Sequence, residues 1–157
     1  MSKKRAVIFD IDGVISDNSN RLQYLLSDNV RYHAEFLKDK PIQEAASLVQ
    51  AFSWYRHMKD HDLEILFNTD RPSYMRDITA EWIADNIHIF NAKVFTRTRH
   101  SLLMDSVGAK EYNLERIMKN YDVVMAFDDC PEACDMYVAN GIPCMLFRKE
   151  LSNASKS

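Results

Sequence analysis

Short apolar runs and helical patterns alternate along this chain. Runs of four or five residues, flanked by charged or turn-forming residues, lie at 6–9, 63–67, 93–96, 123–127 and 143–147. Such short β-rich runs are typical of buried parallel strands. Between them, apolar residues recur with the helical period at 42–58, 75–83, 114–118 and 134–138. The alternation predicts an α/β fold, a doubly wound and mainly parallel five-stranded sheet with helices on both faces.

One stretch departs from this rhythm. Residues 14–41 combine polar turn signals with aromatic residues, and we expect a flap inserted between the first strand and the helix at 42–59. The length suits one or two short helices but not a cap domain of about 50 or more residues. The rest predicts a single domain over 1–149 with a polar tail at 150–157. Gly141, followed by Pro143, predicts a helix end, and Gly108 a loop before a helix at 110–119.

Composition narrows the class of protein. The 157 residues are 46% hydrophobic and carry a net charge of −3, so the chain lacks the basic field that drives non-specific binding to nucleic acids. Three glycines are too few for a glycine-rich loop that cradles phosphate. Three cysteines without a C-x-x-C motif predict reduced thiols in the core. With no run long enough to cross a membrane, we expect a cytoplasmic protein without a membrane partner.

Polar residues gather where the predicted strands end. Together with a lysine in the helix before the fourth strand, they are Asp10, Asp12, Asn68, Thr69, Asp70, Arg71, Lys110, Asp128 and Asp129. The carboxyl ends of parallel strands meet at one edge of a doubly wound sheet, which is where such folds bind ligands. Clustered carboxylates repel one another unless a cation lies between them, and all-oxygen ligands favour Mg²⁺. The sequence therefore predicts a site for magnesium and phosphate.

The motifs VIFDIDGV, ILFNTDRP, Lys110 and MAFDDCPEACD, in this order, resemble the four motifs of the haloacid dehalogenase (HAD) superfamily of phosphotransferases. The resemblance implies a strand order of 5-4-1-2-3. It implies that Asp10 is the nucleophile and becomes an aspartyl phosphate, while Asp12 protonates the leaving oxygen and then activates water. Two aspartates two residues apart on an extended strand end would point the same way.

The same resemblance assigns the remaining site residues. Thr69 and Lys110 would hold the phosphate oxygens. Mg²⁺ would be the cofactor, and its ligands would be Asp10, the main-chain carbonyl of Asp12, Asp128 and Asp129.

A narrower resemblance follows from the spacing of two arginines. Arg21 lies eleven residues after Asp10, and Arg71 lies two after Thr69, which is similar to the 3′-phosphatase domain of bacteriophage-type polynucleotide kinases. This likeness implies that both arginines bind substrate and that the substrate is the 3′-phosphate of a DNA or RNA end. It is compatible with a virus-encoded protein in a host cytoplasm. The chain departs from that pattern at Asp70, where the family usually has glycine, and at Cys130, where arginine is expected.

Other functions remain open at this point. A 5′(3′)-nucleotidase acting on free nucleoside monophosphates is the nearest alternative, and the acidic pI favours it slightly. A phospho-receiver domain also places aspartates, threonine and lysine around Mg²⁺, but Lys110 precedes the last acidic pair here, whereas in receivers it follows. A non-catalytic binding protein is the last alternative, although every proposed catalytic side chain is present.

Two groups of residues could contact a nucleic acid or serve only the fold. The flap carries Tyr24, Tyr32, His33 and Phe36, which either stack on a base or pack the flap onto the sheet. The loop after the third strand carries Arg97, Arg99 and His100, which form either a positive lip or an ordinary solvated loop.

Overall fold

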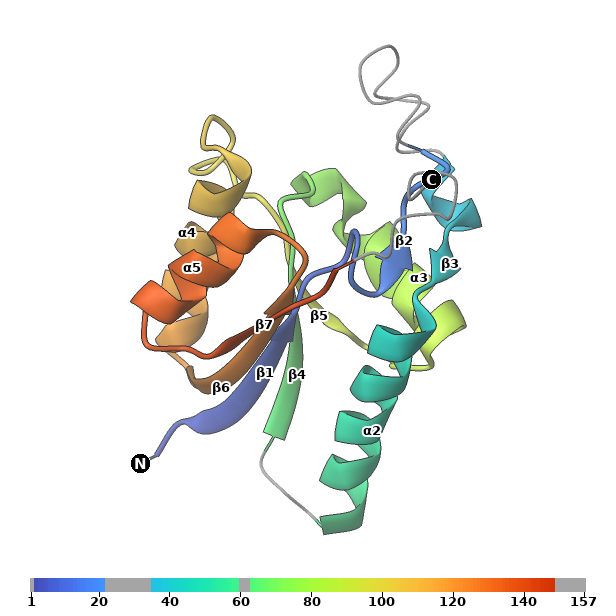
Figure 1. The fold of residues 1–157 in the computed structure, drawn as a ribbon, viewed down its shortest axis with the longest axis horizontal. Coiled ribbons are helices and arrows are strands. Elements are labelled where there is room, and N and C mark those ends of the chain that lie inside the picture. The colour runs from blue at the N-terminus through green and yellow to red at the C-terminus, as the bar shows by residue number, and fades with distance from the viewer. Residues whose placement is uncertain (1, 22–34, 60–62, 149–157) are drawn as a thin grey trace, which may run out of the picture.

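A computed structural model describes residues 2–21, 35–59 and 63–148 of the chain. Figure 1 shows the elements, in which η marks a 3₁₀ helix. In chain order they are β1 (Lys4–Phe9), β2 (Ser16–Asp17), η2 (Glu35–Lys38), β3 (Lys40–Pro41), α2 (Gln43–Lys59), β4 (Leu63–Asn68), η3 (Ser73–Met75), α3 (Arg76–Ile87), β5 (Lys93–Phe95), α4 (Ser106–Met118), β6 (Tyr121–Asp128), α5 (Pro131–Ala139) and β7 (Cys144–Leu146).

The main sheet has five parallel strands in the order β5-β4-β1-β6-β7. When the five strands are numbered 1 to 5 along the chain, this order is 3-2-1-4-5. Listed from the opposite edge strand it becomes 5-4-1-2-3, which is the expected order. The predicted doubly wound fold is therefore confirmed. Because β1 is central and all five strands run the same way, the residues that follow β1, β4, β5 and β6 come together at one edge.

The sheet separates two apolar cores, and alternate residues of β1 supply one core each. Val7 and Phe9 face a core that includes Trp82 of α3, whereas Ala6 and Ile8 face a core that includes Leu114 of α4. Figure 1 shows α2 and α3 on one side of the sheet and α4 and α5 on the other. Helices thus cover both faces, as the alternation of strands and helices predicts.

The segment predicted as a flap contains a small second sheet. β2 and β3 pair antiparallel, with Ser16 opposite Pro41 and Asp17 opposite Lys40. This pairing brings the two ends of the insertion together near the carboxyl end of β1. Residues 22–34, which include Tyr24, Tyr32 and His33, lie outside the described residues, as does the polar tail.

The beginning of α4 corrects one prediction. Gly108 does not lie in a loop, because α4 already begins at Ser106 and Asp105 caps it, accepting a hydrogen bond of 2.7 Å from the Gly108 amide. The first turn carries too few apolar residues to show the helical period. The predicted helix end at Gly141 is confirmed: α5 ends at Ala139, and Gly141 has a φ of 81°, a conformation that favours glycine. Within the described ranges, no helix is long and apolar enough to span a membrane.

Candidate active site

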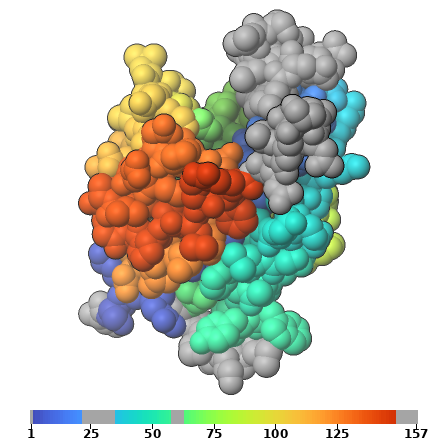
Figure 2. Space-filling view, viewed as in Figure 1, coloured from blue at the N-terminus to red at the C-terminus, as the bar shows by residue number. Residues whose placement is uncertain are grey.

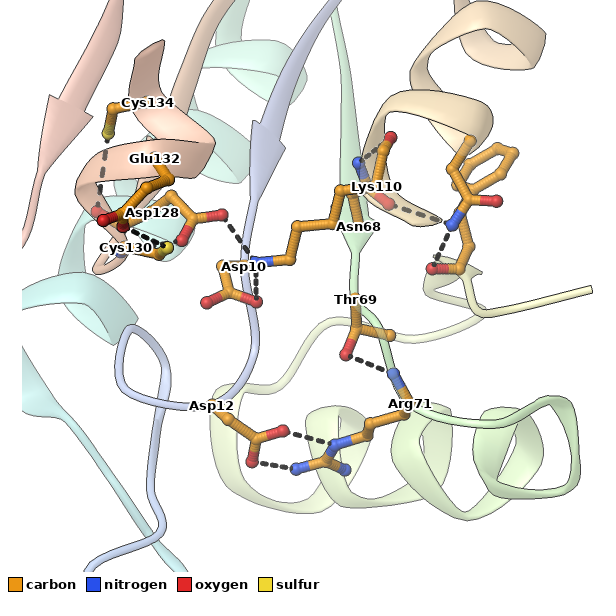
Figure 3. Close-up of polar contacts among 12 residues, drawn as sticks. Asp10, Asp12, Asn68, Thr69, Arg71, Lys110, Asp128, Cys130, Glu132 and Cys134 are labelled. Carbon is orange, nitrogen blue, oxygen red and sulfur yellow. Dashed lines mark hydrogen bonds and ion pairs between the residues drawn. The ribbon is translucent and has the colours of Figure 1, made fainter. Parts of the chain in front are cut away.

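A buried ion-pair group lies at the carboxyl ends of the two central strands. Asp10 directly follows β1, Asp128 ends β6, and Lys110 projects from α4 between them (Figure 3). The Lys110 Nζ lies 2.7 Å from Asp128 Oδ2 and 3.2 Å from Asp10 Oδ1. All three side chains are at most 5% exposed. The resemblance assigned these residues to one site, and the structure brings them together.

Asp129 adds a third carboxylate to this group. One carboxylate oxygen from each of Asp10, Asp128 and Asp129 lies within 4.8 Å of the others, an arrangement that could hold a metal ion. Gly13 makes room for it: its φ is 84°, and a Cβ at this position would overlap the Asp129 carboxylate. Hard divalent cations prefer such all-oxygen ligand sets. We name Asp10, Asp128 and Asp129 the acidic cluster.

The acidic cluster contains more negative charge than its lysine can balance. Burial raises the pKa of Asp10 well above its ordinary value; Lys110 opposes this shift, while Asp128 and Asp129 reinforce it. Burial, together with Asp128, also raises the pKa of Asp129. Burial alone would lower the pKa of Lys110, but Asp10 and Asp128 outweigh it and the pKa rises. A divalent cation would relieve this imbalance, so the residues present fit Mg²⁺.

Asp12 belongs to a different group of charges. β1 ends at Phe9 and the chain turns over residues 11–16, so Asp12 does not lie on an extended strand end as expected. Its carboxylate accepts hydrogen bonds from Arg71 Nε at 2.8 Å and from Arg21 Nη2 at 2.7 Å. Burial would raise the pKa of Asp12, but the two arginines outweigh it and hold the pKa below its usual value.

Each of these arginines is held by further contacts. Arg21 is fully buried, and its Nε donates to both oxygens of Asp39, at 3.0 and 2.9 Å. The guanidinium of Arg71 lies 3.7 Å from the centre of the Phe36 ring, and its Nη1 donates to Thr79 Oγ1 at 3.0 Å. We name Asp12, Arg21, Asp39 and Arg71 the arginine clamp. The two arginines predicted to bind substrate thus both contact Asp12.

Phe36 supports this clamp and does not offer a surface for a base. It is fully buried, and its ring lies 5.5 Å from that of Trp82. For Phe36, the stacking alternative is therefore wrong and the packing alternative holds.

Thr69 directly follows β4, at the edge of the sheet where the sequence places it. It is fully buried, and its main-chain amide donates to Phe95 O at 3.0 Å. Its hydroxyl accepts a hydrogen bond of 3.2 Å from the Arg71 amide. The turn that carries Thr69 is therefore joined to the arginine clamp through Arg71.

Comparison with known proteins connects this arrangement to a family. The family model of the polynucleotide kinase (PNKP) phosphatase domain, which is of the HAD type, matches residues 4–149. The chain belongs to this family. It is therefore a HAD-type phosphatase, and the resemblance read from its motifs is confirmed.

Solved structures agree with the fold. Two chains, one from the Pnkp1/Rnl/Hen1 RNA repair complex and one from a Pnkp1/Rnl/Hen1 complex, match with TM-scores of 0.70 and sequence identities of 21% and 22%. They cover 92% and 93% of this chain, which in turn spans 42% and 46% of theirs. The phosphatase thus corresponds in length to less than half of those proteins. No curated protein matches it.

A buried amide, to which the sequence analysis gave no role, holds the main chain at Lys110 in place. Asn68 is fully buried, and its Nδ2 donates to the main-chain carbonyl of Lys110 at 3.1 Å and to the Tyr137 hydroxyl at 2.9 Å. Asn113 Nδ2 donates to Asn68 Oδ1 at 3.0 Å. These bonds join β4, α4 and α5 beneath Lys110. The signal in the sequence is a single amide that ends the otherwise apolar run ILF of β4.

Arg97 has a structural role that the sequence did not reveal. Its guanidinium donates to the carbonyls of Asp70, Ser101 and Met104, at 2.8, 2.7 and 2.7 Å. The group is thus engaged by main-chain oxygens of its own loop and of the turn at Asp70. Arg99 and His100 are exposed on the same loop.

Proposed function

We propose that this phosphatase removes the 3′-phosphate from a DNA or RNA end, through an aspartyl phosphate on Asp10. The observation that carries the proposal is the acidic cluster with Lys110, found in a chain whose family is the PNKP phosphatase domain. Three carboxylates around one buried lysine suit a site that receives a cation and a phosphate together.

Asp10 is the proposed nucleophile. A carboxylate oxygen of Asp10 attacks phosphorus, and the bond to the leaving 3′-oxygen breaks. Lys110, 3.2 Å from Asp10, and Thr69 at the end of β4 would hold the phosphate oxygens. Asp10, the Asp12 carbonyl and the Asp128-Asp129 pair would hold Mg²⁺, which neutralises charge on the transferred phosphoryl group.

Asp12 is the proposed acid and base. It gives a proton to the leaving 3′-oxygen and later takes one from the water that attacks the aspartyl phosphate, so the enzyme returns to its starting state. Arg21 and Arg71 occupy the oxygens that these proton transfers need. A substrate phosphate that draws the Arg71 guanidinium to itself would free Asp12 Oδ2 and remove the main contact that holds the pKa of Asp12 low. This exchange would connect the predicted substrate contacts of the arginines with their observed contacts.

A nucleotidase that acts on free mononucleotides is the second candidate, and the net charge of −3 favours it. Phosphate release in the presence of Mg²⁺ separates the two. A 3′-phosphorylated oligonucleotide, its 5′-phosphorylated counterpart and the 3′- and 5′-mononucleotides are compared at matched concentration. The proposal predicts the highest kcat/KM for the 3′-phosphorylated oligonucleotide. Release from mononucleotides alone would contradict it and establish the nucleotidase.

A further inference from the structure

The loop at 97–104, between β5 and α4, is a built structure at the catalytic edge. Arg97 holds it from within through the carbonyls of Ser101 and Met104, both at 2.7 Å. A turn closes it: the Ser101 amide donates to Thr98 O at 3.1 Å, and the Thr98 amide donates to Ser101 Oγ at 2.9 Å. Ser101 is fully buried. The loop therefore presents its outer side chains from a fixed backbone.

This loop is joined directly to the turn that carries Thr69. The Arg97 amide donates to Arg71 O at 2.9 Å, and Arg97 Nε donates to Asp70 O at 2.8 Å. In Figure 1 the loop, drawn in yellow, rises beyond the carboxyl end of the sheet, and in Figure 2 it forms a separate projection at the upper edge of the molecule. A substrate whose phosphate reaches Thr69 must pass this projection if the remainder of it extends toward α4.

The outer surface of the loop is apolar. Leu102, Leu103 and Met104 are consecutive and are 58%, 102% and 40% exposed. Runs of three exposed apolar residues are costly in a soluble protein unless they serve a function. Arg99 and His100, also exposed, precede them on the same turn. The loop thus presents apolar side chains together with the cation of Arg99. Through Arg97, its main chain is hydrogen-bonded to the turn that carries Thr69.

We propose that the loop at 97–104 is a nucleobase-binding lip, at which Leu102 and Leu103 contact the bases next to the 3′ end while Arg99 faces a backbone phosphate. The proposal rests on the proposed function. Leucine and methionine side chains insert between base steps in other nucleic-acid complexes. Contacts to the face of a base tolerate any sequence, because every base has such a face. The occupant is a single-stranded end, because its bases are free to leave their stack. A free mononucleotide has no neighbouring base to offer.

The test is the binding of a fluorescein-labelled single-stranded oligonucleotide that lacks a 3′-phosphate, followed by fluorescence anisotropy. The double variant Leu102→Ser/Leu103→Ser is expected to weaken binding at least about fivefold. The matched control is Phe90→Ser, since Phe90 is 72% exposed but precedes β5, at the opposite end of that strand. This control is expected to bind as the wild type does. Arg99→Ala is expected to weaken binding and to reduce its dependence on salt.

The outcomes separate the lip from the catalytic proposal. Unchanged binding by the double variant would contradict the proposal that the loop binds nucleobases. A protein partner would then be the alternative ligand of the exposed leucines. A wild type that releases phosphate from p-nitrophenyl phosphate but binds no oligonucleotide would overturn the lip and leave the phosphatase standing. Binding that depends on the leucines, without hydrolysis of the 3′-phosphate, would support the lip and contradict the proposed function.

Discussion

Two groups of charged residues lie side by side at the catalytic edge, and they differ in how their charges balance. In the acidic cluster, Asp10, Asp128 and Asp129 face a single lysine, Lys110. Burial without enough positive charge raises the pKa of Asp10 and of Asp129. A further cation would balance the charge of this group.

The arginine clamp is balanced within itself. Arg21 and Arg71 face Asp12 and Asp39, two cations against two carboxylates. Here burial is outweighed by the arginines, and the pKa of Asp12 falls. We infer from this difference that the acidic cluster binds a cation, whereas the arginine clamp holds the side chain of Asp12 in position.

The largest effect is expected at Asp10, the proposed nucleophile in the acidic cluster. Asp10→Asn removes the attacking oxygen and should reduce kcat by about 10⁴-fold or more, as with other catalytic nucleophiles. The substitution also removes one of the crowded negative charges, so thermal unfolding should show no loss of stability. Phosphate release and a melting curve on the same sample measure both. Substantial turnover by a clean preparation would disprove the role of Asp10.

Breaking the balance of the arginine clamp should cost stability. Arg21→Met leaves Asp39 buried and without its guanidinium, and we expect a loss of about 3–5 kcal/mol in the free energy of unfolding by urea. The matched control is the double variant Arg21→Met/Asp39→Leu, which removes both charges and should recover much of the loss. Equal losses in the single and double variants would show that the charge balance is not what stabilises this group.

The hydrogen-bond network of Asn68 joins Lys110, beside the acidic cluster, to the rest of the fold. Asn68→Leu keeps the number and branching of the side-chain heavy atoms but leaves the Lys110 carbonyl and the Tyr137 hydroxyl without their donor, which should cost about 1–3 kcal/mol. Because Lys110 would be held less firmly, kcat should fall by about tenfold while KM changes little. A change confined to stability would assign Asn68 to the fold alone. Asn113→Leu is the matched control, because Asn113 bonds to Asn68 and not to the Lys110 carbonyl. Its effect on kcat should be smaller.

The smallest effect is expected at Glu64, near the amino end of β4, where one carboxylate faces three cations. Burial would raise the pKa of Glu64, but Lys4, Lys93 and Arg56 outweigh it and the pKa is lowered. Its stabilising contribution is therefore present above its ordinary pKa and lost as the pH falls through the folded-state value. Glu64→Gln should remove up to about 1 kcal/mol at pH 7 and less near pH 3, a difference that urea unfolding at both pH values measures.

Much of this architecture could be predicted because it depends on short patterns of neighbouring residues in the sequence. The five apolar runs locate the strands, and the polar residues that end them locate the catalytic edge, since parallel strands must deliver their carboxyl ends together. The start of α4 was missed because its first turn, with Gly108, has a cap in place of an apolar period. The helix end at Gly141 could be predicted because a helix often ends at a glycine, which adopts a positive φ easily, and Pro143 follows shortly after it.

The partners of side chains could not be predicted, because they depend on packing between distant segments. Nothing near Arg21 in the sequence indicates that it binds Asp39 and Asp12, and nothing near Arg97 shows that it holds its own loop. Both arginines read as surface or substrate groups until the fold places carboxylates and carbonyls around them. The same holds for Phe36, which aromatic character alone cannot assign to a ligand or to the core.

The central claim is that the acidic cluster is incomplete without a divalent cation, whereas the arginine clamp is not. The most direct test is the melting temperature measured against increasing Mg²⁺ at constant ionic strength, for the wild type, Asp129→Asn and Arg71→Lys. We expect a saturable rise in the wild type and in Arg71→Lys, and its loss in Asp129→Asn. A wild-type melting temperature that does not respond to Mg²⁺, or a rise that persists in Asp129→Asn, would contradict it.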